Sequence, residues 1–289
     1  MITRYYCFAG IYIGITMPEE LFYINECRLA PFRTDIMKAD WSFVFECVEK
    51  LSAPKGSLVY RESGMHYRVG ADHSIRYIHT RADDWTKARV RVEFCGNTVN
   101  AEVNIDCSQK RIPVKTVLES IAAEHLVARN KGLIFHCSYI DHVGKAILFT
   151  APSETGKSTQ ADLWHAFRDA EIINGDRAAI RLENNVLLAE GVPFAGSSKY
   201  CKNRSLPIEA IVYLSQAPQT TIRKIRGYEA FSKLWEGVCV NNWDKVDMEQ
   251  VSSIVQKVAS EIPVYHLSCT PDESAVIALE EALRKLVSP

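Results

Sequence analysis

The pattern of apolar and polar positions changes character near residue 113. Up to that point, short runs alternate between apolar and polar residues and are separated by turn residues, which is typical of antiparallel strands with one solvated face. Two such pairs are separated by Gly70-Ala71-Asp72-His73 and by Gly96-Asn97. The expected strands are Tyr5–Met17 with Gly10 and Gly14 as bends, Ser57–Val69, Ser74–His79, Ala88–Phe94 and Val99–Ile105. We therefore expect a β-rich N-terminal domain over residues 1–112.

Beyond Pro113, strands and helices follow one another, which favours an α/β domain over residues 113–289 with a boundary near residues 108–114. Helical spacing marks Val114–Ala128, and Thr270-Pro271-Asp272 is a start signal for the last helix. The expected helices are Val114–Ala128, Ser158–Ala170, Val246–Ser260 and Asp272–Leu286. The expected strands are Leu133–Ile140, Ala146–Thr150, Glu171–Asn174, Ala178–Leu182, Val186–Ala189, Ile208–Leu214 and Val264–Ser268.

Composition and charge narrow the class of protein. With 47% apolar and 24% charged residues, the 289-residue chain can bury a core without metals or disulfides. A net charge of −1 gives no electrostatic case for nucleic acid or an anionic membrane as partner. The apolar stretch Cys7–Met17 is too short to span a bilayer. Nine cysteines, an odd number without a signal peptide, favour reduced thiols and a cytoplasmic protein.

One segment carries recognisable chemistry. Ala151–Thr159 reads Ala-Pro-Ser-Glu-Thr-Gly-Lys-Ser-Thr between an expected strand and an expected helix, which is the arrangement of a phosphate-binding P-loop with Ala in place of the usual first Gly. Consecutive backbone amides and the helix N-terminus attract phosphate oxygens. Lys157 would neutralise the outer phosphates, and Ser158 would ligate Mg²⁺. The predicted nucleotide-binding residues are Ser153, Glu154, Thr155, Gly156, Lys157, Ser158 and Thr159, and the predicted ligand is ATP with Mg²⁺.

A P-loop needs an acidic metal partner at the end of a neighbouring strand. Ile172-Ile173-Asn174-Gly175-Asp176 is an apolar run that ends in a carboxylate. Asp176 is therefore the predicted second metal ligand beside Ser158, held directly or through water. A turn aspartate after glycine is the alternative interpretation.

These residues together resemble a known family. Leu133–Thr150, the P-loop and Ile172–Arg177 are similar to the HPr kinase/phosphorylase family, whose wider relatives have the fold of phosphoenolpyruvate carboxykinase. The family carries a histidine 15 residues ahead of the P-loop's first residue, and His136 stands at that spacing from Ala151. Gly191–Gly196 and Pro263–Asp272 resemble HPr-kinase-like proteins found beside peptide-modification genes. The resemblance covers residues 115–289, and the N-terminal part matches no named family.

The resemblance implies an ATP-dependent kinase, a transferase that acts on a serine hydroxyl of a peptide or protein and assembles into homo-oligomers. The β-rich N-terminal domain would then help to recognise the acceptor. Family members have two adjacent aspartates where this chain has Gly175-Asp176, so one acid is missing. Since phosphoryl transfer depends chiefly on positioning and charge neutralisation, the loss need not abolish it. His136 could take the hydroxyl proton in place of the missing acid.

Cations for the transition state are expected in the loop Ser197–Arg204. Lys199 and Arg204 are the predicted catalytic cations there, beside His136, Asp176 and Lys157, while Lys202 is equally compatible with a solvated position. Arg177 is a further candidate. The basic run Arg223-Lys224-Ile225-Arg226 is typical of a solvated face.

Three other functions remain open on the sequence. A nucleotide-binding interaction module without catalysis is favoured by Ala151 and by the single aspartate. A kinase of the same fold could instead act on a small hydroxyl compound. A carboxykinase-like decarboxylation would need additional basic and metal-binding residues, which the sequence does not identify.

Overall fold

The computed structural model describes residues 1–19, 28–62, 64–78, 84–104 and 112–287. Contacts divide the chain into two compact units, Met1–Ala122 and Ala123–Pro289. The division falls later than the expected boundary because helix α1 (Val114–Ile121) packs on strands of the first unit. Most of the expected boundary region, as well as His79 and Ile105 at the ends of two expected strands, lies outside the described residues.

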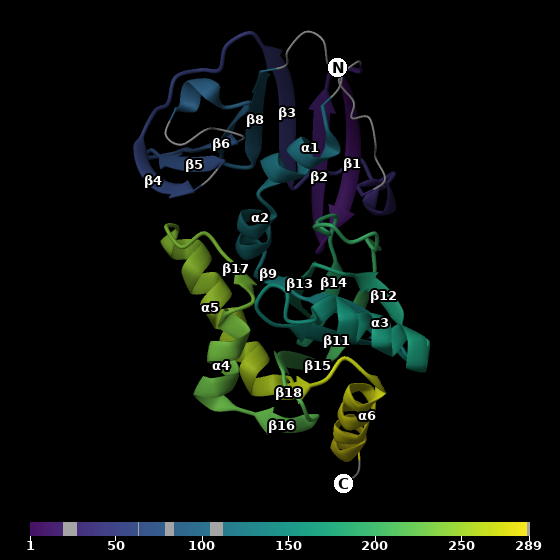
Figure 1. The fold of residues 1–289 in the computed structure, drawn as a ribbon. Coiled ribbons are helices and arrows are strands. Elements are labelled where there is room, and N and C mark those ends of the chain that lie inside the picture. The colour runs from purple at the N-terminus through teal and green to yellow at the C-terminus, as the bar shows by residue number, and fades with distance from the viewer. Residues whose placement is uncertain (20–27, 63, 79–83, 105–111, 288–289) are drawn as a thin grey trace. The chain divides into compact units, whose positions relative to one another are not determined.

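The first unit contains one mixed eight-stranded sheet (Figure 1). Its order is β1-β2-β3-β8-β7-β6-β5-β4, in which β3 runs parallel to both β2 and β8 and the other pairs are antiparallel. The strands are β1 (Ile2–Phe8), β2 (Ile11–Met17), β3 (Trp41–Val48), β4 (Ser57–Glu62), β5 (Met65–Val69), β6 (Ser74–Ile78), β7 (Val90–Cys95) and β8 (Thr98–Asn104), with short 3-10 turns at Ala30–Phe32 and Trp85–Lys87.

The hairpins expected around residues 70–73 and 96–97 are confirmed as β5–β6 and β7–β8. Two expected single strands are hairpins instead. Tyr5–Met17 folds back at Ala9-Gly10, where both residues have positive φ, and Ser57–Val69 is divided into β4 and β5. Gly14 makes no bend, because it lies inside β2 and pairs with Tyr5.

The second unit is built on a ten-stranded mixed sheet with the order β12-β10-β11-β15-β14-β13-β9-β17, and β18 pairs with both β15 and β16. The neighbours β11, β15 and β18 run parallel to one another, so their carboxyl ends meet at one edge. The strands are β9 (Gly132–His136), β10 (Ser138–His142), β11 (Lys145–Thr150), β12 (Glu171–Asn174), β13 (Arg177–Glu183), β14 (Val186–Gly191), β15 (Ser205–Gln216), β16 (Thr221–Ile225), β17 (Val238–Cys239) and β18 (Val264–Cys269).

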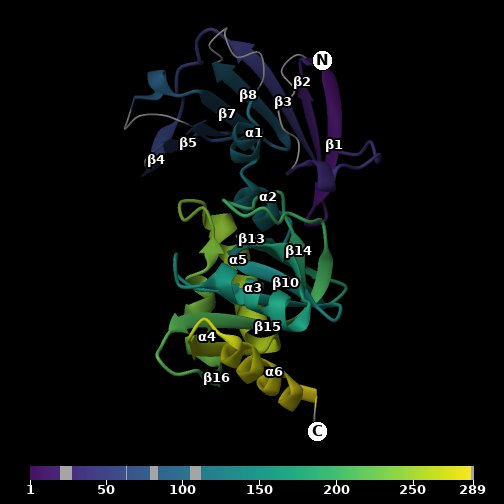
Figure 2. The same ribbon diagram turned by 45° about the vertical axis from the view of Figure 1, so that its right-hand side comes forward.

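Helices cover both faces of this sheet (Figures 1 and 2). Apolar side chains of α3 (Lys157–Arg168) and α6 (Glu273–Val287) pack on one face, together with Phe149 and Val212. On the other face, α2 (Ala123–Arg129), α4 (Gly227–Trp235) and α5 (Lys245–Glu261) enclose a core that includes Phe135 and Ile211. The mixed α/β architecture agrees with the expected fold class.

The single helix expected over Val114–Ala128 is two helices, because Ala122 adopts a left-handed conformation with φ of 52° and ends α1. Across the described ranges of the chain, none of the helices has the length and apolar character needed to cross a membrane.

Candidate functional site

The Ala151–Thr159 segment joins the end of β11 to the start of α3, as the pattern predicts. Gly156 precedes the helix with φ of 111°, which L side chains rarely adopt. A Cβ there would meet no atom within 4 Å, so backbone conformation, rather than crowding by the protein, requires the glycine. Gly156, at the N-cap position, has no side chain to cap the helix. The first N–H groups of the helix, which lack intrahelical acceptors, are therefore available to an anion.

Lys157 is buried beside its own loop. Its Nζ donates to the carbonyl oxygens of Ala151 at 3.0 Å and Pro152 at 3.2 Å. Burial lowers the pKa of the Lys157 ammonium, and the negative charge of Asp176 opposes that change. Two carbonyl acceptors and a nearby carboxylate thus hold a cation at the phosphate loop.

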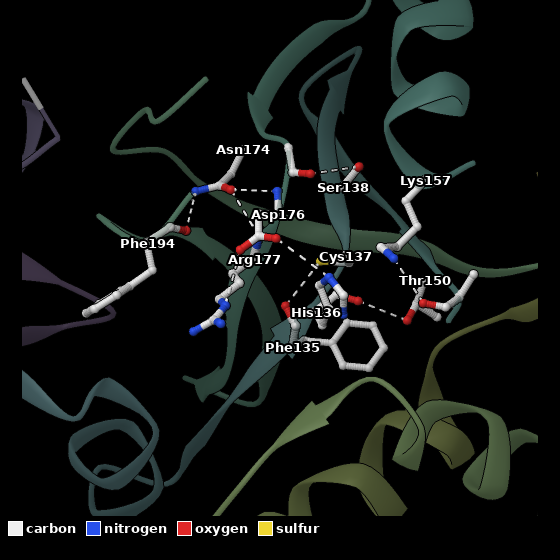
Figure 3. Close-up of polar contacts among 12 residues, drawn as sticks. Phe135, His136, Cys137, Ser138, Thr150, Lys157, Asn174, Asp176, Arg177 and Phe194 are labelled. Atoms are coloured by element: carbon white, nitrogen blue, oxygen red, sulfur yellow. Dashed lines mark hydrogen bonds and ion pairs between the residues drawn. The ribbon is translucent and has the colours of Figure 1, made fainter. Parts of the chain in front are cut away.

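Asp176 lies between the side chains of His136 and Arg177 (Figure 3). Its Oδ1 is 3.6 Å from His136 Nε2, and its Oδ2 is 3.2 Å from Arg177 Nε. His136, Arg177 and Lys157 together hold the pKa of the Asp176 carboxyl below its ordinary value, although partial burial acts in the opposite direction. The carboxylate is therefore ionised and available as a hard oxygen ligand at neutral pH.

His136 is fixed through its backbone at the end of β9. Its N–H donates to Gly237 O at 2.7 Å. Its carbonyl oxygen accepts from Thr150 Oγ1 at 3.0 Å (Figure 3). The imidazole, one third exposed, faces Asp176 from the neighbouring antiparallel strand, where His136 pairs with Arg177.

The turn that carries Asp176 is held by Asn174, which is completely buried. The Asn174 Oδ1 accepts from the N–H groups of Asp176 at 2.9 Å and Arg177 at 3.0 Å. Its Nδ2 donates to the carbonyls of Val192 at 3.0 Å and Phe194 at 3.2 Å (Figure 3). One amide therefore fixes both the backbone at Asp176 and the segment that follows β14.

We expect Asn174→Asp to destabilise the protein by about 1–3 kcal/mol, because the second carboxylate oxygen would face two carbonyl oxygens without a proton to donate. Urea unfolding at neutral pH measures the loss. Asn184→Asp, in the exposed turn between β13 and β14, adds the same charge and is the control. Equal losses in the two variants would contradict the role assigned to Asn174.

A cavity of about 420 Å³ brings most of the predicted site together. Its volume lies in the ordinary range for small-molecule sites. The P-loop, the strand ends and the segment after β14 each supply part of the wall. The lining residues are His136, Ser153, Glu154, Lys157, Ser158, Ala161, Asp162, Ile172, Gly175, Asp176, Ser197, Ser198, Lys199 and Tyr200.

A second cavity of about 570 Å³ lies on the other flank of the P-loop, at the carboxyl ends of β15 and β18. Thr155, Gly156 and Thr159 line this cavity, and Glu154 lines both. All seven predicted nucleotide-binding residues therefore border one of the two cavities, and the loop separates them.

Two predicted or candidate cations are placed elsewhere. The Arg204 guanidinium pairs with Asp141 at 3.0 Å and does not line either cavity. Lys202 pairs with Glu171. Lys199 lines the first cavity, with its Nζ 5.1 Å from the centre of the Tyr200 ring.

The segment after β14 is fixed along β12. Lys202 N–H donates to Ile173 O at 3.0 Å, Cys201 forms a bridge with Asn174, and Gly191 N–H donates to Arg204 O at 2.8 Å. The segment also crowds Gly175, where a Cβ would lie 2.3 Å from Ser198 Oγ and 2.8 Å from Ser198 Cβ. An aspartate at 175 has no room unless this wall moves.

A separate group of potential metal ligands, His125, Asp244 and Asp247, has ligand atoms within 4.8 Å of one another. Their carboxylate oxygens already have donors. Arg129 donates to Asp247 and Asp244 at 2.8 Å each, while Asp244 also caps α5 through the N–H groups of Val246 and Asp247. This group is an ion-pair network that joins α2 to α5.

Several residues of the site, Asp162 and Asn174 among them, were not found from the sequence. Asp162 lies one helical turn after Ser158, so its i, i+4 spacing could have indicated a second acid near the P-loop. Two of the four hydrogen bonds of Asn174 go to Val192 and Phe194, far along the chain, and no local signal indicates them. The other two go to the N–H groups of Asp176 and Arg177, a local turn that Asn174-Gly175 could have indicated.

No family model matches the chain, and no curated protein sequence matches it. Among solved structures, the chain is similar to the Hpr(Ser) kinase/phosphatase from Coxiella burnetii, with a TM-score of 0.32 and 11% sequence identity. The match covers 53% of this chain and 88% of that one. A similarity of this size is too weak to bear on activity, so the function must be argued from the residues of the site.

Proposed function

We propose that this protein is a Mg·ATP-dependent phosphotransferase that phosphorylates a hydroxyl group, namely a serine of a peptide or protein. The observation that carries the proposal is a single cavity lined by Lys157 and Ser158 of the phosphate loop and by His136 and Asp176 of the neighbouring strand ends. Phosphate-binding groups, a metal-type carboxylate and a proton acceptor are the components that phosphoryl transfer requires.

The donor set fits a magnesium ion. Ser158 offers a hydroxyl and Asp176 an ionised carboxylate in the same cavity, and both are hard oxygen ligands. With few protein ligands, phosphate oxygens and water complete such a site. When bound, Mg²⁺ would neutralise negative charge on the transferred terminal phosphate and on the leaving diphosphate of ATP. Because Arg177 contacts Asp176 from a half-exposed position, its side chain can move aside into solvent.

His136 is the residue proposed to accept the proton. The oxygen of the acceptor hydroxyl bonds to the terminal phosphorus of ATP as the bond to the bridging oxygen breaks, and the hydroxyl proton passes to the imidazole. The products are the phosphorylated acceptor and ADP. Asp176, at 3.6 Å, stabilises the imidazolium that forms, so one carboxylate and one histidine replace the pair of acids.

The test is transfer of labelled phosphate from Mg·[γ-³²P]ATP to a library of serine peptides, followed by mass spectrometry of the products. We expect His136→Asn to lower the rate of transfer by about 10²-fold, which is the lower end of general-base contributions. The effect is small because removal of the hydroxyl proton contributes little in a loose transition state. ATP binding should be preserved.

His73→Asn is the control, since His73 belongs to the first unit and pairs with Asp72. If ATP stabilises the protein while no peptide is ever labelled, the site binds nucleotide without catalysis. Transfer that is equally fast in His136→Asn would remove His136 from the mechanism.

A further inference from the structure

The second cavity contains a buried polar group that the phosphate site does not use. Gln160 lines it from the first turns of α3 and is only 2% exposed. Its Nε2 donates to Cys269 Sγ at 3.4 Å, but no donor in the described part of the chain reaches its buried Oε1. Burial raises the pKa of the Cys269 thiol, so the sulfur is neutral and gives Gln160 a weak partner.

An unpaired buried amide oxygen is costly in a folded protein, so it calls for an explanation such as a bound molecule that supplies the missing donor. Here the oxygen belongs to a residue that borders a cavity of about 570 Å³ at the carboxyl ends of the parallel strands, where α/β sheets bind ligands. A small rotation of the side chain toward the cavity would let the oxygen accept an N–H from a bound molecule.

The other walls suit a flat aromatic ring. Leu214, Ala217 and Pro271 provide apolar surface, while Gln216 and Thr270 add polar groups. Gln216 donates to Glu154 O at 3.4 Å and so ties this wall to the phosphate loop. Since Glu154 borders both cavities, a ligand whose phosphates occupy the loop can extend its other end into this space.

This geometry points to the second cavity as the nucleobase subsite, in which Gln160 Oε1 accepts a hydrogen bond from the exocyclic amine of adenine. The inference rests on the proposed nucleotide-dependent function and adds selection of the base. Hypoxanthine has a carbonyl oxygen in place of that amine. Its oxygen would face Gln160 Oε1, and two acceptors cannot form a hydrogen bond with each other. Gln160 is thus a specificity-determining residue for ATP over ITP.

The experiment compares binding of Mg·ATP, Mg·ITP and Mg·tripolyphosphate by titration calorimetry. We expect wild-type protein to bind ATP about tenfold more tightly than ITP, the effect of one hydrogen bond to a buried partner. Gln160→Met is nearly isosteric and removes the oxygen, so the two nucleotides should bind equally. Tripolyphosphate should bind this variant as it binds wild type. Lys157→Met should weaken binding of all three.

The free Gln160→Met variant should also melt no lower than wild type, because it removes an unpaired buried acceptor. Should that variant fail to fold, the ATP-to-ITP comparison on wild-type protein decides alone. Equal binding of ATP and ITP to wild type, or tighter binding of ITP, would overturn the role of Gln160 while tripolyphosphate binding leaves the phosphate site standing. No binding of any of the three would overturn both the subsite and the proposed function.

Discussion

Replacing Lys157 with Met should lower the rate of phosphoryl transfer by about 10³-fold, as loss of a preorganised group that stabilises developing charge does. Lys157 is the cation that the P-loop itself places in the cavity, and its Nζ is held by Ala151 and Pro152. Methionine keeps the length of the side chain and removes only the charge and its hydrogen bonds. Single-turnover kinetics with labelled ATP measures the change.

Lys145→Met is the matched control, because Lys145 lies exposed at the start of β11 and pairs with Glu209. It should transfer phosphate like wild type. ATP at ten times its dissociation constant should stabilise wild type and the control by about 1.4 kcal/mol, but not Lys157→Met at the same concentration. A Lys157→Met protein that folds and transfers phosphate normally would exclude the P-loop as the phosphate site.

Asp176→Asn should lower transfer by a similar factor, about 10³-fold, because the amide keeps the shape but loses the charge that a metal ion requires. Raising the Mg²⁺ concentration should recover part of the lost rate if the defect lies in metal binding. Asp169→Asn, at the exposed end of α3, is the control for removal of one negative charge. A variant that transfers phosphate normally would contradict the proposed metal ligand.

The same substitution should change the response of stability to acid. The pKa of Asp176 in the folded protein lies below its ordinary value because of His136, Arg177 and Lys157. Its stabilising contribution is therefore complete above the pKa of the unfolded chain, about 3.9, and is lost as pH falls through the lower folded value. Urea midpoints measured from pH 6 down to pH 3 should fall more steeply for wild type than for Asp176→Asn.

Local patterns predicted those parts of the fold that depend on local pairing. Hairpins with turn residues between alternating strands were found, as was the strand–loop–helix of the phosphate site. The break between α1 and α2 at Ala122 was not predicted, because alanine favours a helix. The left-handed conformation of Ala122 depends on tertiary packing rather than on the local sequence. The edge strand β16 was not predicted, because it is mostly polar and lacks a clear apolar pattern. The parallel pairing of β3 with β2 and β8 was not predicted either, because it joins residues far apart in the sequence.

The residues of the candidate site likewise fall into those set by local sequence and those set by long-range contacts. Lys157 and Ser158 begin the helix that follows β11 and its short loop, and Asp176 lies two residues after β12, so their positions are consequences of local sequence. Arg204 was expected in the site because its loop passes nearby, yet Asp141 on a neighbouring strand holds it away. Such long-range pairings are decided by the packed structure, which here brings Asp141 to 3.0 Å from the half-exposed Arg204 guanidinium.

The carbonyl oxygens that accept hydrogen bonds from Lys157 also affect which anions can bind this lysine. Lys157 Nζ donates to the carbonyl oxygens of Ala151 and Pro152, so an anion that binds this lysine must offer more than these two neutral acceptors already provide. A single free phosphate ion meets only part of the loop, whereas a polyphosphate chain reaches the lysine and the helix amides together. Under the proposed function, the loop should therefore select nucleotides over inorganic phosphate.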